Sequence, residues 1–143
     1  MQEFCGESEM SIKIKPSDKA FADCLKAAHD YVCERCGKQG RMETSHVYSR
    51  KHRTIRWCKD NANCLCHYCH RIWHDSPLDA FVWFVDMFGE GRQNILIEKR
   101  NSRVKVSKLE EKDIKKHYVE QLQIINIKRS EGAQGYIDFI SYQ

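Results

Sequence analysis

Two pairs of cysteines constrain this chain more than any other feature of its sequence. Cys33 and Cys36 form one pair, Cys66 and Cys69 form the other, and two residues separate the cysteines within each pair. Four thiolates complete a tetrahedral zinc site, and this spacing lets both sulfurs of a pair reach one ion from a tight turn. The alternative is two unrelated redox motifs. The sequence therefore predicts a structural zinc that joins the two pairs.

The segment between the pairs is unusually long. Residues 37–65 separate them, whereas common zinc ribbons place about 15–20 residues there. A segment with its own structure is therefore expected between the halves of the zinc knuckle. Cys64 is a rival ligand because it precedes Cys66 by only two residues, and the cysteines at 5, 24 and 58 are expected to be unliganded thiols.

The stretch 66–74, CHYCHRIWH, holds more potential ligands than one zinc ion needs. His70 and His74 are four residues apart, which places both imidazoles on one face of a helix. This spacing suits one divalent ion gripped from one side, and zinc already has four sulfurs. We therefore assign the two histidines to a second ion, with a helix-capping role as the alternative for His74. His67 is expected to point elsewhere.

Composition and signal content narrow the class of protein. Apolar residues make up 41% of the 143 residues and charged residues 31%, which favours one folded domain. The longest apolar run, residues 80–85, is far shorter than the roughly 20 residues of a membrane span, and no secretory signal is visible. We expect a cytoplasmic protein, in which eight cysteines favour metal binding over disulfides.

Local patterns predict a mixed α+β chain. Residues 15–30 predict a helix with Ser17 or Asp18 as its N-cap. Residues 31–50 indicate a knuckle followed by short β-structure, and residues 66–75 a short helix.

Helices are also predicted after the knuckle. Ser76 and Pro77 form an N-cap and N1 pair that opens an apolar helix, which Gly89 ends before a second short helix. A stripe on the first helix is expected to pack inward: Leu78, Phe81, Val82, Val85 and Phe88.

A last helix is predicted near the C-terminus. Ser107 followed by Glu110 is a capping-box pattern that begins a helix to about residue 125. Its apolar stripe, which could pack in the core or against a second copy, comprises Leu109, Ile114, Tyr118, Leu122 and Ile125. The tail at 126–143 could be a strand or a docked extension.

The order of these motifs resembles that of HNH endonucleases, which have a ββα-metal (His-Me finger) core. The matching elements are Cys33-x-x-Cys36, Ser45-His46, Asp60-Asn61, Leu65-Cys66 and Cys69-His70. The segments SHVYSRKHRTIRW and DNANCLCHYCHRIWHDSP also resemble phage-encoded recombination endonucleases of the NinG/Rap type. The resemblance covers residues 16–100 and implies a small ββα-metal core around the zinc knuckle, with flanking helices on both sides.

The resemblance assigns roles to five polar residues. His46 matches the general base, and Asn61 the residue that ties the loop between the strands by backbone hydrogen bonds. His70 matches a ligand of the catalytic ion, and His74 a ligand present in some branches. Ser45 stands where many relatives carry an acidic or histidine ligand, so it is the weakest member of the expected ligand set.

The chemistry of phosphodiester hydrolysis agrees with these roles. The reaction needs an activated water and a cation that neutralises charge on the phosphate and the leaving oxygen. A neutral imidazole at His46 is suited to accept the water's proton near pH 7. Asn63 would take the place of Asn61 only in a shifted register.

A basic loop follows His46. Arg50, Lys51, Arg53 and Arg56 could bind phosphates on either side of the scissile bond, which gives salt-sensitive affinity with little sequence preference. The alternative is a solvated loop. Trp57 is expected in the core rather than stacked on a base.

We therefore expect a metal-dependent HNH DNA endonuclease, acting in phage recombination or DNA processing and leaving 5′-phosphate and 3′-hydroxyl ends. It would use structural Zn²⁺ and catalytic Mg²⁺ or Mn²⁺ on duplex or branched DNA, with a homodimer as one arrangement. The alternative is a non-catalytic zinc-containing nucleic-acid-binding module, and a protein-interaction module is a weaker third. The chain divides into an extension and helix at 1–30, an HNH core at 31–75, helices at 76–125 and the tail.

Overall fold

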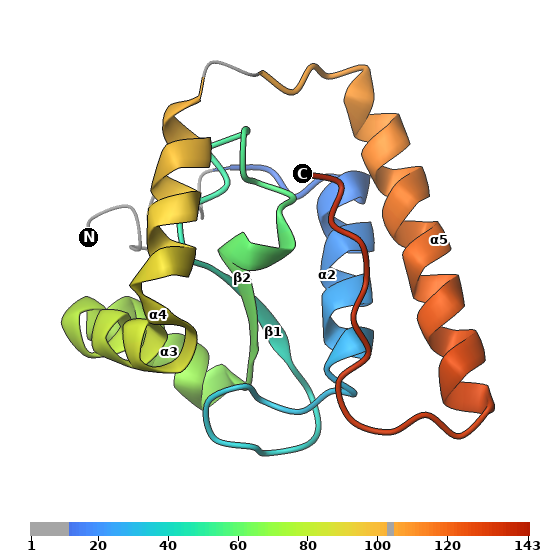
Figure 1. Cartoon of the computed structure of the whole chain (residues 1–143), viewed down its shortest axis with the longest axis horizontal. Coiled ribbons are helices and arrows are strands. Elements are labelled where there is room, and N and C mark those ends of the chain that lie inside the picture. The colour runs from blue at the N-terminus through green and yellow to red at the C-terminus, as the bar shows by residue number, and fades with distance from the viewer. Residues whose placement is uncertain (1–11, 103–104) are drawn as a thin grey trace.

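A short antiparallel hairpin occupies the centre of the molecule, in a computed structural model that describes residues 12–102 and 105–143 (Figure 1). Its strands are β1 (Glu43–His46) and β2 (Ala62–Leu65). Helix α3 (His67–Asp75) begins two residues after β2, so the order along the chain is strand, strand, helix. The mixed α+β class predicted from the sequence is confirmed.

Helices cover the hairpin on both sides. His46 pairs with Ala62 at one end of the register and Glu43 with Leu65 at the other. All four residues of β2 are buried, since α3 and α4 lie on one side of the hairpin and α2 and α5 on the other (Figure 1). A strand covered on both faces has no solvent side, which explains why its sequence, ANCL, lacks a polar–apolar alternation.

Helix α2 (Pro16–Ala28) begins earlier than predicted. Lys15 is its N-cap, and Asp18 occupies the third helical position, where its carboxylate accepts a hydrogen bond of 2.8 Å from the Lys15 backbone N–H. The prediction of Ser17 or Asp18 as N-cap is wrong because Pro16 already supplies a favourable first helical residue, with fixed φ and no N–H to satisfy.

A buried ion pair fastens the basic loop to α2. The guanidinium of Arg56 donates two hydrogen bonds to the carboxylate of Asp18, at 2.9 and 2.6 Å. Both side chains are almost completely buried, at 4% and 7% exposed. The loop that the sequence assigns to DNA is therefore held to the protein at this residue.

Helix α5 (Glu110–Ser130) packs along α2. The predicted capping box is present, since Ser107 and Glu110 exchange two hydrogen bonds of 3.3 Å. Leu109 lies before the helix and is 84% exposed, so it is not part of the apolar stripe. The stripe packs within this chain through its buried members, Ile114, Tyr118 and Ile125.

The C-terminal tail is a docked extension without regular secondary structure. It returns beside α2 (Figure 1), and the Ile137 N–H donates a hydrogen bond of 2.9 Å to the carbonyl of Ala28. Ile137 and Phe139 are buried in the core shared by α2 and α5. Trp57 is fully buried in the same core, as predicted.

Helix α4 (Pro77–Asn101) is two helical segments joined at Gly89, whose φ of 83° and ψ of 161° are not helical. The predicted break is confirmed. The predicted stripe is partly wrong, because Leu78 and Val82 are exposed whereas Ala80 and Phe84 are buried. Ala80 and Phe84 pack with Trp73, Leu96 and the loop after β1 in a second core. Among the described residues, no helix is both long and apolar enough to cross a membrane.

Replacement of Asp18 by alanine should destabilise the protein strongly. The substitution leaves the buried guanidinium of Arg56 without its counter-charge, so we expect the free energy of unfolding to fall by roughly 3–5 kcal/mol. Chemical denaturation measures this change. Asp23→Ala is the matched control on the same helix, because Asp23 pairs with the exposed Lys19 and should leave the unfolding midpoint almost unchanged. Equal shifts in the two variants would contradict the assignment.

Candidate functional site

The four paired cysteines come together. The Sγ atoms of Cys33, Cys36, Cys66 and Cys69 all lie within 4.8 Å of one another. The Sγ atoms of Cys36 and Cys66 are 3.7 Å apart, close to the roughly 3.75 Å that tetrahedral Zn–S bonds of about 2.3 Å require. The arrangement suits a metal ion and fits structural zinc.

The other described cysteines lie outside this cluster. Cys64 is fully buried in β2, and burial raises the pKa of its thiol to about 12. Burial likewise raises the pKa of Cys24 to about 12. At Cys33, burial opposes ionisation, but backbone N–H groups outweigh it and lower the pKa to about 7. Cys64 is not part of the four-sulfur cluster, so its position excludes it as the rival ligand.

The knuckle is joined directly to the hairpin. Glu34 lies between the first two cysteines, and its N–H donates a hydrogen bond of 2.9 Å to the carbonyl of Cys64 in β2. Its carboxylate accepts one of 2.6 Å from the Cys64 N–H and one of 3.3 Å from the Asn63 amide. The position of the sulfur cluster therefore sets the position of β2.

Asn61 fixes the loop that follows β1. Its side-chain oxygen accepts a hydrogen bond of 2.9 Å from the Tyr48 N–H, and its amide nitrogen donates to the carbonyls of Tyr48 (3.0 Å) and Ile55 (3.2 Å). Its own carbonyl accepts a bond of 2.8 Å from the Val47 N–H. Asn61 is fully buried, so its side chain does not reach solvent. Its hydrogen bonds hold the loop that directly follows His46.

His70 and His74 converge on α3. Their Nε2 atoms are 3.0 Å apart, and both lie on one face of the helix, as their spacing predicts. Two imidazole ligands at about 2.0–2.1 Å from one ion, with an angle of 90–110° between them, would place their nitrogens about 2.9–3.4 Å apart. The pair therefore fits two positions of one coordination shell. Within the described residues, it belongs to no group of three or more His, Cys, Asp or Glu ligands.

Glu43 orients this pair and was missed by the sequence analysis. One oxygen of its carboxylate lies 2.7 Å from Nδ1 of His70, and the other lies 2.9 Å from Nδ1 of His67. Burial alone would raise the pKa of Glu43, but the bonds to the two histidines outweigh it and lower the pKa below its usual value. An ionised Glu43 accepts the Nδ1 proton of His70, which leaves a lone pair on Nε2 of His70 that faces Nε2 of His74.

A broad groove brings three of the predicted site histidines together. His46, at the end of β1, lines it with His70 and His74, and α2 forms the opposite wall. The groove has a volume of about 1260 Å³. Ser45 is fully buried and does not line the groove, so we remove it from the ligand set. The alternation of side chains along β1 turns Ser45 away from the face that carries His46.

The basic loop is turned largely toward the protein. Arg56 is buried against Asp18, and Arg53 donates a hydrogen bond of 2.7 Å to Glu111. Arg50 is 7% exposed and donates to the carbonyl of Ile12 at 3.2 Å. Of the four residues assigned to phosphate, Lys51 alone is exposed. Part of the positive charge of the basic loop is therefore matched within the protein, although Arg50 also lines the groove that holds His46, and Lys51 and Arg53 line a separate pocket.

Comparison of the chain with protein-family models, with curated proteins and with solved structures gives no match.

The sulfur cluster should bind one zinc ion per chain. Cys36→Ser should lose the tight zinc and lower the melting temperature, because Cys36 supplies one of four sulfurs. Elemental analysis of the purified protein measures the metal content. Cys64→Ser is the matched control, since Cys64 lies outside the cluster, and it should keep its zinc. Loss of zinc from Cys64→Ser with retention in Cys36→Ser would reverse the assignment.

Proposed function

We propose that this chain is a metal-dependent endonuclease of the HNH type that hydrolyses phosphodiester bonds in DNA. The observation that carries the proposal is the order strand, strand, helix around a groove lined by His46, His70 and His74. In the ββα-metal arrangement that the sequence resembles, the base comes from the first strand and the metal ligands from the helix.

A divalent ion, Mg²⁺ or Mn²⁺, would be held by Nε2 of His70 and Nε2 of His74. Two protein ligands leave the remaining positions to water and to oxygens of the substrate phosphate. Such an ion would neutralise charge on the phosphate and stabilise the leaving oxygen. Glu43 keeps His70 in the tautomer that this binding requires.

His46 is the proposed general base. It lies at the end of β1 and is mostly buried, but it lines the wall of the groove, where its imidazole would meet a water molecule. A neutral imidazole accepts the proton of that water as the water attacks phosphorus. Asn61 binds the backbone of Val47 and Tyr48, the two residues after His46, and would hold the base in position.

A non-catalytic zinc-containing nucleic-acid-binding module is the second proposal. The observation in its favour is that His70 and His74 supply only two protein ligands, with Ser45 buried elsewhere. Under this proposal the zinc knuckle organises a binding surface and no bond is cut. A phage origin and a role in recombination or DNA processing belong to the first proposal and rest on the resemblance of the sequence alone.

His46→Ala should abolish most cleavage. Loss of the base should lower the rate by about 10²–10⁴-fold in a plasmid-nicking assay with Mg²⁺ or Mn²⁺. His117→Ala is the control, because His117 lies on α5 outside the groove. Cleavage by His46→Ala at the wild-type rate would remove His46 from the mechanism. No cleavage by the wild-type protein with either ion would favour the binding module.

Glu43→Ala should weaken the second metal site without removing the zinc. Loss of the carboxylate frees His70 to rotate and to take the other tautomer, so the affinity for Mn²⁺ should fall about 10–100-fold. Titration of the zinc-loaded protein with Mn²⁺, followed by electron paramagnetic resonance, measures this directly. His67→Ala removes the partner of the other carboxylate oxygen and should bind Mn²⁺ nearly as wild type does.

A further inference from the structure

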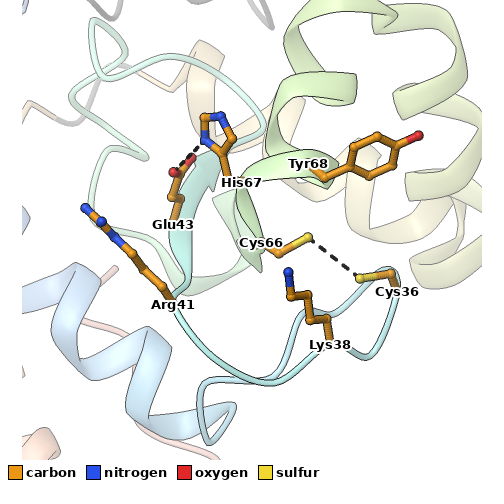
Figure 2. A pocket seen from close by; sticks show the side chains of 7 residues that line it. All are labelled: Cys36, Lys38, Arg41, Glu43, Cys66, His67 and Tyr68. Carbon is orange, nitrogen blue, oxygen red and sulfur yellow. Dashed lines mark hydrogen bonds and ion pairs between the residues drawn. The ribbon is translucent and has the colours of Figure 1, made fainter.

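A second hollow lies on the other side of Glu43 from the groove. It has a volume of about 410 Å³ and is open to solvent between the knuckle loop, the start of β1 and the first turn of α3. Figure 2 shows Cys36 and Lys38 on the knuckle loop, Arg41 and Glu43 on the strand side, and His67 on the helix. We call this hollow the knuckle pocket.

Glu43 connects the knuckle pocket to the histidine pair. Glu43 lines it, and the same carboxylate reaches His67 in the pocket and His70 in the groove, at 2.9 and 2.7 Å. Glu43 therefore lies between the histidine pair and the pocket, and a strand bound at His70 would pass its carboxylate before it reached the cations of the pocket.

Cations without carboxylate partners lie along this path. Lys38 and Arg41 are exposed in the knuckle pocket, and within the described residues neither has an acidic group in ion-pair distance. Lys26 lies on the α2 wall of the groove and also has no such partner in the described ranges. These three contrast with Arg53 and Arg56 of the basic loop, whose charges are already matched by carboxylates.

Of the two pocket cations, Arg41 is the better placed. Four thiolates around Zn²⁺ would carry a net charge of about −2, and Lys38 extends toward Cys66, where it offsets part of that charge (Figure 2). The guanidinium of Arg41 extends away from the sulfurs, on the side of Glu43 (Figure 2). It is therefore free to make paired hydrogen bonds to phosphate oxygens.

We propose that the knuckle pocket binds the DNA backbone beside the scissile phosphate, with Arg41 as the principal contact, Lys38 as a second and Lys26 on the groove wall. The proposal rests on the proposed function, because it assumes that the substrate is DNA and that cleavage takes place beside His70 and His74. The sequence predicted that the basic loop after β1 makes the main contact with the DNA backbone, whereas the proposal assigns that contact to the zinc knuckle.

The test compares three double variants, each of which removes two positive charges. Arg41→Ala/Lys38→Ala removes the cations of the knuckle pocket. Lys51→Ala/Lys105→Ala removes the exposed lysine of the basic loop and the lysine after α4 that lines the same pocket as it, and Lys115→Ala/Lys116→Ala on α5 is the control for net charge. Fluorescence anisotropy with a labelled DNA oligonucleotide, without added divalent ion and over a range of salt, measures affinity and its salt dependence. Zinc content is measured for each variant.

The knuckle variant should bind about tenfold more weakly at physiological salt. The slope of log affinity against log salt should also fall by about 1–2, because two phosphate contacts are lost. The α5 control should bind as wild type, and Arg41→Lys should recover part of the loss. A knuckle variant that keeps its zinc and binds DNA with wild-type affinity would overturn the proposal. A larger loss of affinity in Lys51→Ala/Lys105→Ala than in the knuckle variant would also overturn it.

A second assay, cleavage of the same oligonucleotide with Mg²⁺, distinguishes failure of this proposal from failure of the proposed nuclease activity. If the wild-type protein cleaves DNA but the knuckle variant binds normally, the backbone contact is wrong and the nuclease stands. If binding depends on Arg41 and Lys38 while no cleavage occurs, the nuclease is wrong and the binding surface stands.

Discussion

The cluster of four sulfurs joins two segments far apart in the sequence: the knuckle loop, and the junction where β2 ends and α3 begins. Cys66 is the N-cap of α3 and Cys69 lies in its first turn, so an ion on the sulfurs fixes where the helix begins. Glu34 transmits the same constraint to β2 through both its backbone and its carboxylate. The direction of α3, and with it the direction of His70, follows from this cluster.

Two further side chains carry that constraint to the groove. Asn61 holds the loop after β1 by three side-chain hydrogen bonds to backbone groups, which places His46 at the groove wall. Glu43 extends from β1 to α3 and fixes the ring of His70. Both residues are positioned by the hairpin, so the chemistry proposed for this site depends on the knuckle through backbone geometry rather than through direct contact with zinc.

Local sequence patterns predicted the elements well where the signal was itself local. The cysteine spacing, the break at Gly89 and the capping box at Ser107 each depend on a few neighbouring residues, and the structure has all three. The apolar stripe of α4 was partly wrong because its first turns are apolar on most faces. Which face is buried then depends on the neighbours, and the second core selects Ala80 and Phe84.

The sequence by itself predicted the four-sulfur cluster, because two short cysteine spacings each bring two thiols together. It also placed His70 and His74 on one helical face. Only the tertiary structure decided which charges are free, because an arginine is paired or exposed according to partners far along the chain. Arg56 is paired by Asp18, whereas Arg41 has no such partner among the described residues. The hydrogen bonds of Glu43 likewise became visible only in the tertiary structure, because His67 and His70 on α3 lie far from Glu43 in the sequence.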